Sequence, residues 1–265
     1  MKNMYTFEKN KKILDKWYNH DISKGEISPD GVYYKGKTYT TDYGQVWREL
    51  GKEDEQWNTS SRRILFISKD PNEVDNPYDM RGPDLTQNPD GTLSFGCRFN
   101  NNLLRITAGL HTISESYYEP YETINSIQKL NDIWQQAAVA RINVKKHSGG
   151  NRISNSELKK WIKEYKTFIL EQISLLDPHI IICCGGNGII KEFVISEYLK
   201  EKDSNNLKSP DDNWIYYSSK YKKWVIDSYH LNPYGNISDH DLYHKIMMFF
   251  KNSLNRNIGI SSNEF

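Results

Sequence analysis

Short apolar runs alternate with amphipathic stretches along most of this chain. Four runs have the composition of strands that are buried on both faces: residues 64–67, 137–144, 179–184 and 224–228. Hydrophobic residues recur at helical spacing in the segments between and after them: residues 101–110, 121–134, 155–176 and 238–254. This alternation predicts an α/β fold, a three-layer αβα sandwich with a central, mainly parallel four-stranded sheet.

The first 60 residues precede this pattern and have a different character. Residues 5–20 carry aromatic and aliphatic side chains among charges, which predicts an amphipathic helix. Residues 31–39 predict two short strands around a glycine turn, and residues 43–50 a further short helix. We therefore expect a single domain over residues 1–265, in which residues 1–60 form a helix-and-hairpin extension packed on a core of residues 61–255.

Composition narrows the class of protein. Hydrophobic residues make up 37% of the chain and charged residues 26%, which is typical of a globular protein rather than a disordered one. No apolar run approaches the length of a membrane span and the start lacks a signal-peptide core, so we expect a cytoplasmic protein with no membrane partner. The three cysteines and seven histidines match no disulfide framework or metal-ligand spacing, and we expect no metal and no cofactor.

Charge alone does not indicate a nucleic-acid partner. The chain has 35 basic and 34 acidic residues, a net charge of +1. Strong phosphate binding usually needs a basic surface. A DNA-binding protein with this balance has to gather its basic residues on one face.

Candidate chemistry lies in four segments. Three lie at or near the ends of predicted strands: Ser68-Lys69-Asp70-Pro71-Asn72, Asn143 and His230-Leu231-Asn232-Pro233. The fourth, Leu93-Ser94-Phe95, lies in the long loop after the first strand. Each has an ordinary alternative, because Asp-Pro is common in turns, a loop phenylalanine is often core, an asparagine can cap a turn and a loop histidine can be inert. Ligands of open α/β sheets bind outside the carboxyl ends of the strands. The segments are therefore expected to converge there.

The order of these segments resembles the uracil-DNA glycosylase superfamily over roughly residues 60–250. The first segment resembles the motif Gly-Gln-Asp-Pro-Tyr-His, and the last resembles His-Pro-Ser-Pro. The resemblance implies a DNA glycosylase with a fold of that superfamily. Asp70 would orient water and stabilise the cationic sugar, and His230 would donate a hydrogen bond to the oxygen of the departing base. Phe95 would stack on a flipped-out pyrimidine and Asn143 would read its edge.

The resemblance also implies a wider set of contacts. The base pocket would include Ser68, Lys69 and Asn72, and the DNA would contact Lys145, Lys146, Asn232 and Tyr234. Tyr234 stands where the family has a leucine wedge that fills the gap left in the duplex. The expected partner is DNA, duplex or single-stranded, and the expected state is a monomer.

Asn72 is the largest departure from the family pattern. The uracil-specific branch has a tyrosine at this position, which blocks the space beside carbon 5 of the base. A smaller asparagine predicts a pyrimidine with a bulky or polar 5-substituent, such as phage DNA carries, and hence a role in host defence. A uracil repair enzyme, an inactive protein of the same fold that binds modified or abasic DNA, and a small-nucleotide enzyme are the alternatives.

Overall fold

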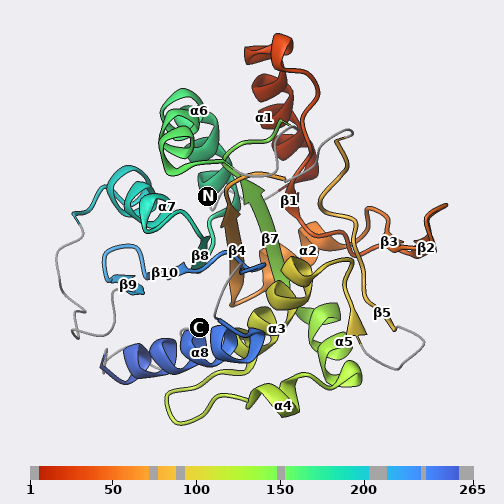
Figure 1. The fold of residues 1–265 in the computed structure, drawn as a ribbon, viewed down its shortest axis with the longest axis vertical. Coiled ribbons are helices and arrows are strands. Elements are labelled where there is room, and N and C mark those ends of the chain that lie inside the picture. The colour runs from red at the N-terminus through yellow and green to blue at the C-terminus, as the bar shows by residue number, and fades with distance from the viewer. Residues whose placement is uncertain are drawn as a thin grey trace.

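The computed structural model describes residues 6–71, 77–87, 93–147, 153–202, 214–233 and 237–256 (Figure 1). A six-stranded sheet with the order β1-β7-β4-β8-β10-β9 forms the centre of the molecule. Its strands are β1 (Gly31–Val32), β4 (Arg63–Ser68), β7 (Ala138–Asn143), β8 (Ile180–Cys184), β9 (Ile215–Ser218) and β10 (Lys223–Ser228). The four inner strands are parallel, and the two edge strands are antiparallel to their neighbours.

The α/β class and the mainly parallel sheet are confirmed, but the strand number was wrong. The four predicted strands are the four inner strands, and β1 and β9 extend the sheet at its edges. β1 is only two residues long and pairs with Ala140 and Arg141 of β7, so it is too short to show a strand pattern in the sequence. The missed strands changed the edges of the sheet and left its centre as predicted.

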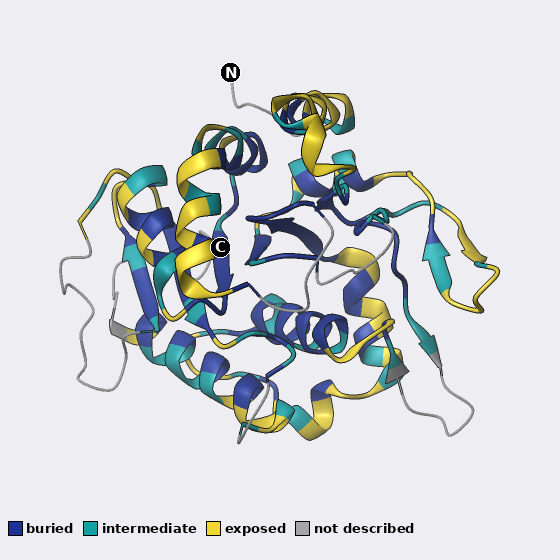
Figure 2. Ribbon diagram, turned by 45° about the horizontal axis from the view of Figure 1, so that its top comes forward, coloured by how far each residue is buried: buried dark blue, intermediate teal, exposed yellow. Residues whose placement is uncertain are grey.

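Helices cover both faces of this sheet (Figures 1 and 2). One face carries α1 (Phe7–His20), α6 (Asn155–Leu176), α7 (Ile189–Phe193) and a following π-helical turn (Val194–Tyr198). The other face carries α3 (Arg98–Thr112), α4 (Tyr121–Ile124), α5 (Ile127–Gln136) and α8 (Asp239–Arg256). We call these the α6 face and the α3 face.

Side chains of the inner strands alternate between the two faces, which explains their continuous apolar runs. On β4, Ile64 and Phe66 pack in the cluster of the α3 face, whereas Leu65 and Ile67 pack in that of the α6 face. All four are fully buried. A strand that is covered on both faces has a mostly apolar sequence.

The first sixty residues are partly built into the sheet. β1 belongs to it, and α2 (Glu53–Thr59) packs against β1 and β7. The predicted helix over residues 43–50 was wrong, because β2 (Thr38–Thr40) and β3 (Val46–Arg48) form a hairpin there, and Gly44 turns the chain with a φ of 76°. A short helix (Ile22–Lys24) and a second hairpin, of β5 (Thr86–Gln87) and β6 (Leu93–Ser94), complete the fold.

Helix α6 begins at Asn155, as predicted, and Ser154 caps it. Ser154 accepts from the backbone N–H of Glu157, and the Glu157 carboxylate accepts from the Ser154 N–H. This reciprocal pair satisfies two backbone donors that the first turn of a helix leaves open. None of the helices in the described part of the chain is both long and apolar enough to pass through a membrane.

Gly109 of α3 lies where helices α3 and α8 meet. A Cβ atom there would approach the sulfur of Met247 to 2.5 Å and the hydroxyl of Tyr243 to 2.7 Å. We expect Gly109→Ala to lower the free energy of unfolding by about 1–3 kcal/mol, the usual cost of overpacking. Urea denaturation measures this change. The sign of the change in the free energy of unfolding is diagnostic, because Gly→Ala in a helix stabilises a protein where the added methyl group meets no obstacle. A higher free energy of unfolding would show that α8 can move aside.

Candidate functional site

The inner strands end in register at one edge of the sheet. Asn143, Ser68, Cys184 and Ser228 are neighbours across β7, β4, β8 and β10. From β4 the chain runs to β7 on one side, and from β7 it crosses back to β8 on the other side of β4. The connections that follow β4 and β8 therefore run in opposite directions along the sheet. Such a switch point is where open α/β sheets bind ligands. The sequence-predicted segments at residues 68–71, 143 and 230–233 all lie at this edge.

The register of the strands also determines the face of the sheet from which each of these side chains projects. Cys184 packs in the cluster of the α3 face, and Ser68 is its partner on β4. Asn143 pairs with Ser68 and so projects from the same face. Ser68 is fully buried, beside the thiol of Cys184. The α3 face of the carboxyl edge is therefore lined by polar side chains.

Asp70 follows β4 by two residues and lies at the same edge. It is 7% exposed, and its Oδ2 is buried with no hydrogen-bond partner among the described residues. Burial raises the pKa of this carboxyl, and the charges of Lys145, Lys69 and Arg141 oppose the shift. A carboxyl group with a raised pKa beside cations is a typical acid or base of an active site.

Asn143 is held by its backbone and keeps part of its amide unsatisfied. Its N–H donates to Oδ2 of Asp30 at 2.8 Å, and its Nδ2 lies 2.8 Å from the sulfur of Met80, a weak acceptor. Its Oδ1 is buried without a partner. A buried amide in this condition gains free energy when a polar ligand pairs with it.

A buried network anchors Asn143 from the α6 face. Oδ2 of Asp30 accepts a hydrogen bond from Nζ of Lys146, and Oδ1 of Asp30 accepts one from Nε2 of Gln172 at 2.8 Å. Nε2 of Gln172 also donates to Oδ1 of Asn10 at 2.9 Å. Lys146 donates to the carbonyl of Asn143 at 3.2 Å. Asn10 and Asp30 belong to the N-terminal segment, which therefore supports the site.

The predicted DNA contact of Lys146 was wrong. Its side chain is fully buried, paired with Asp30, and its ammonium lies 4.4 Å from the centroid of the Trp17 ring. A lysine in this position cannot reach a phosphate without breaking a buried ion pair. The partner lies 116 residues earlier in the chain, so no local pattern revealed it.

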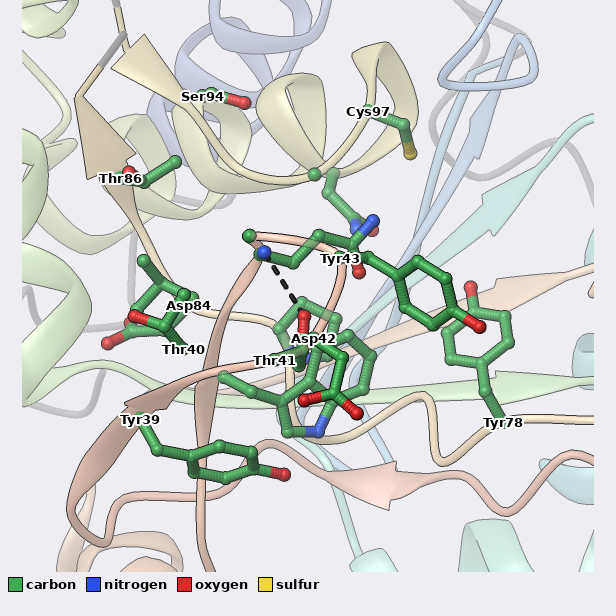
Figure 3. Close-up of a pocket in the computed structure, with 17 residues that line it drawn as sticks. Tyr39, Thr40, Thr41, Asp42, Tyr43, Tyr78, Asp84, Thr86, Ser94 and Cys97 are labelled. Atoms are coloured by element: carbon green, nitrogen blue, oxygen red, sulfur yellow. Dashed lines mark hydrogen bonds between the residues drawn. The ribbon is translucent and has the colours of Figure 1, made fainter.

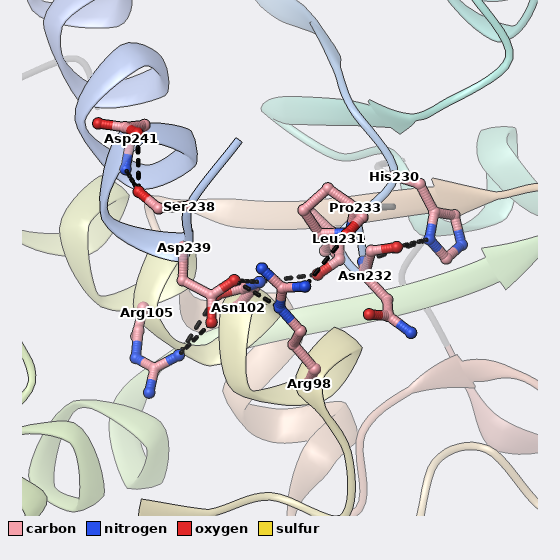
Figure 4. Close-up of polar contacts among 10 residues, drawn as sticks. All are labelled: Arg98, Asn102, Arg105, His230, Leu231, Asn232, Pro233, Ser238, Asp239 and Asp241. Carbon is pink, nitrogen blue, oxygen red and sulfur yellow. Dashed lines mark hydrogen bonds and ion pairs between the residues drawn. The ribbon is translucent and has the colours of Figure 1, made fainter. Parts of the chain in front are cut away.

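His230 lies beyond the end of β10 and faces α3. Its ring centroid is 5.4 Å from that of Phe99, and its Nδ1 accepts from the N–H of Asn232 at 3.2 Å (Figure 4). Nδ1 also lies 3.2 Å from the carbonyl oxygen of Asn232. The tautomer in which Nδ1 accepts from the Asn232 N–H carries its proton on Nε2 and can donate to a substrate oxygen, whereas the tautomer that donates from Nδ1 to the carbonyl cannot. Burial lowers the pKa of His230, the contact with the Asn232 carbonyl opposes this shift, and the charges of Lys69 and Arg141 add to it. The imidazole is therefore neutral near pH 7.

Two helices clamp the loop that carries His230. Asn102 of α3 donates to the carbonyl of Leu231 at 2.7 Å and to Asp239 of α8 at 2.9 Å. Arg98 donates to the carbonyl of Pro233 at 3.1 Å and to Asp239 at 2.8 Å (Figure 4). These contacts fix the position of the histidine relative to the sheet.

The structure does not bring Phe95 into the site. Its ring is fully buried and packs edge-on against Trp134 at 4.8 Å and tilted against Tyr33 at 6.1 Å. A ring that is enclosed in this way presents no face to a base. Phe99, four residues later in the first turn of α3, contacts His230 and also lies 4.1 Å from the guanidinium of Arg141. Phe99 is thus the aromatic side chain that contacts both His230 and Arg141.

The remaining predicted residues lie around the edge or outside the described residues. Lys69 is half-buried, and Lys145 is 8% exposed with its ammonium 5.8 Å from the Trp161 ring. Asn232 is half-buried and positions His230 through its backbone. Asn72 and Tyr234 lie outside the described residues. The role of each in contacting DNA stays a prediction.

A cavity of about 390 Å³ opens at the ends of β4, β8 and β10. Its lining includes Lys69, Gly185, Asp227, Ser228, Tyr229 and His230. Its volume is within the range of small-molecule pockets. Asp227 pairs with Cys183 and so belongs to the α6 face, and burial raises the pKa of its carboxyl to about 6. His230 lines this cavity, whereas Asp70, Asn143 and Arg141 are not among its lining residues.

A second cavity, of about 780 Å³, lies beside the β2–β3 hairpin (Figure 3). Tyr39, Tyr43, Trp47 and Tyr78 contribute aromatic side chains to it, and Cys97 lies on its other side. Asp70, Asn143 and His230 do not line it. It neighbours the turn before α3 and is separate from the polar edge.

Arg141 is the residue that sequence reasoning missed. It lies on β7 two positions before Asn143 and is 7% exposed. The signal was present, since one arginine interrupts the apolar run of residues 137–144.

Within the segments that the structure describes, no group of three or more histidine, cysteine or acidic side chains could hold a metal ion. No family model matches the chain, and none of the curated proteins matches it.

Proposed function

We propose that this protein is a DNA glycosylase that hydrolyses the bond between a flipped-out pyrimidine and its deoxyribose. The observation that carries the proposal is the convergence of Asp70, Asn143 and His230 at one edge of the sheet, with buried oxygen atoms of Asp70 and Asn143 that lack partners. These are a carboxylate, an amide and a neutral imidazole donor, three groups that base excision requires.

Each group has a defined task in the proposed reaction. The C1′–N1 bond breaks, and its electron pair moves to the base while positive charge develops on the sugar. The Asp70 carboxylate stabilises that charge and takes a proton from the water that adds to C1′. Nε2 of His230 donates to the oxygen of the base, where negative charge grows, and Asn143 pairs with the edge of the base. The products are a free base and an abasic site.

The proposed substrate is a 5-substituted pyrimidine in DNA. This part of the proposal depends on Asn72, which replaces the blocking tyrosine of the uracil-specific branch. Lys69 and Lys145 adjoin Asp70 and supply positive charge at the mouth of the site. A protein that removes such bases from phage DNA would act in host defence.

Oligonucleotides with one target base each test the function. Strands containing uracil, a thymine mismatch, 5-hydroxymethylcytosine or a glycosylated 5-hydroxymethylcytosine are incubated with the protein, and released bases are identified by mass. We expect release of a 5-substituted base, leaving alkali-labile sites in the strand. His230→Ala should remove the activity and leave DNA affinity unchanged.

The outcomes separate the alternatives. Faster release of plain uracil than of any 5-substituted base would identify a uracil repair enzyme and overturn the substrate assignment. A shift of modified DNA in a gel, with no base released, would identify an inactive binding protein of this fold. Binding of free nucleotides without any binding of oligonucleotides would favour a small-nucleotide enzyme.

A further inference from the structure

Arg141 has a setting that packing alone does not explain. It projects from β7 toward the α3 face, in register with Phe66 of β4, and is 93% buried. A charged side chain in the middle of a parallel sheet is costly unless a partner offsets the lost hydration. Within the described ranges, Arg141 forms no ion pair, and its Nε is buried without a hydrogen-bond partner. The guanidinium interacts with the hydroxyl of Tyr33, which is not a carboxylate and does not balance its charge. Its Nε is a donor that awaits an acceptor.

The neighbours of Arg141 are the proposed catalytic groups. Its guanidinium carbon lies 4.1 Å from the centroid of the Phe99 ring, and the same ring lies 5.4 Å from His230. Its charge acts on both Asp70 and His230. Asn143 lies two residues further along the same face of β7, a rise of about 7 Å that an arginine side chain can span. The guanidinium therefore belongs to the same polar site.

We propose that Arg141 is a catalytic residue that stabilises the negative charge on the departing base. This inference rests on the proposed function, and it adds a permanent positive charge to the single hydrogen bond that His230 donates to the base. The electron pair of the C1′–N1 bond leaves with the base, so the base carries a full negative charge until it is protonated. A neutral imidazole stabilises that anion through one hydrogen bond only, whereas a guanidinium supplies a permanent positive charge.

The arrangement divides charge across the breaking bond. Asp70 places a negative charge on the side of the sugar cation, and Arg141 a positive charge on the side of the base. In a buried site such fixed charges act more strongly than in water, because no solvent screens them. The charge of Arg141 also favours the neutral form of His230.

The first test compares leaving groups. Single-turnover cleavage is measured for wild-type protein and for Arg141→Met on matched oligonucleotides that carry uracil or 5-fluorouracil, together with the best natural substrate. We expect a loss of about 10²–10³-fold on the best substrate, the usual cost of one oxyanion donor. The loss should be smaller for 5-fluorouracil than for uracil, since its anion needs less stabilisation. Arg141→Lys should recover part of the rate.

A matched control variant separates the effect of losing the charge of Arg141 on the cleavage rates from the effect of losing its packing. Arg62 is a half-buried arginine at the opposite edge of the sheet, where it donates to the carbonyls of Leu110, His111 and Ile113. Arg62→Met should lower stability without changing the ratio of the two cleavage rates. Arg141→Met keeps an apolar stem against Phe99, so its melting temperature should equal or exceed that of the wild type. An equal loss on both leaving groups would overturn the proposal.

A binding measurement does not depend on catalysis. The probe is 5-nitrouracil, a free base that is anionic near neutral pH, with neutral thymine as its comparison, and calorimetry gives both affinities. The wild type should bind the anion at least tenfold more tightly than Arg141→Met does, and thymine equally. Equal anion affinity would overturn the role of Arg141. A wild type that releases no base but shows this difference would refute the glycosylase and still support Arg141 as an anion receptor.

Discussion

Replacing Asp70 by asparagine should lower the single-turnover rate of base excision by about 10²–10⁴-fold, the range for loss of a positioned acid or base. The amide has nearly the same shape but carries no charge, so it neither stabilises the sugar cation nor accepts a proton from water. DNA affinity should stay close to that of the wild type, because the buried carboxylate is not a phosphate contact. Rates from quenched single-turnover reactions and gel-shift affinities measure the two quantities.

The same substitution should raise stability. Oδ2 of Asp70 is buried without a partner, and burial raises the pKa of this carboxyl. The native state therefore holds the proton more tightly than the unfolded chain. The stability that this proton contributes is present below the unfolded pKa and is lost as the pH rises through the folded pKa. Asp70→Asn should remove this part of the pH dependence and show a higher melting temperature at neutral pH.

The wild-type rate should follow the same ionisation. Only the carboxylate form of Asp70 is active, so the rate rises with pH through the raised pKa, and the acidic limb lies above the usual range of aspartate. Asp70→Glu keeps a titrating carboxyl group, so it serves as the control variant for the acidic limb of the pH–rate profile. An Asp70→Asn protein that cleaves at the wild-type rate would remove Asp70 from the mechanism and leave Asp227 as the carboxyl group to test.

Replacing Lys146 by methionine should lower the free energy of unfolding by about 3–5 kcal/mol, as expected when one partner of a buried ion pair is removed. Both side chains of the Lys146–Asp30 pair are fully buried. Without the ammonium, the Asp30 carboxylate keeps the N–H of Asn143 and the amide of Gln172 as partners, but no cation balances its charge. Urea denaturation at neutral pH measures the change.

Two further variants make this prediction specific. Lys16 forms an ion pair with Glu171 in which both side chains are largely exposed, at 54% and 40%. Lys16→Met should cost less than about 1 kcal/mol, since exposed pairs contribute little. The double variant Asp30→Asn/Lys146→Met removes both charges and should recover most of the loss of Lys146→Met. A single variant as stable as the wild type would show that the pair contributes nothing to the fold.

The edge of the sheet illustrates how far sequence reasoning reached. The apolar runs predicted the four inner strands, and the rule for carboxyl ends placed Asp70, Asn143 and His230 together. The structure places all three at that edge, with Asn143 and Ser68 in register. It placed Phe95 in the core and Phe99, four residues later, beside His230. Phe95 lies in the bend between β6 and α3, and Phe99 lies in the first turn of α3, so the path of the chain into the helix decides which ring reaches the site.

The spacing of apolar residues was enough to predict the α/β class, the inner strands and the edge at which polar side chains gather, because burial on two faces leaves a local pattern in the chain. The partners of those polar side chains became known from the packing of distant elements. Lys146 pairs with Asp30 across 116 residues, and Arg141 lies between Phe99 and the proposed catalytic groups. Such pairings depend on how distant elements pack, and the free energy that selects them is not encoded in the spacing of neighbouring residues.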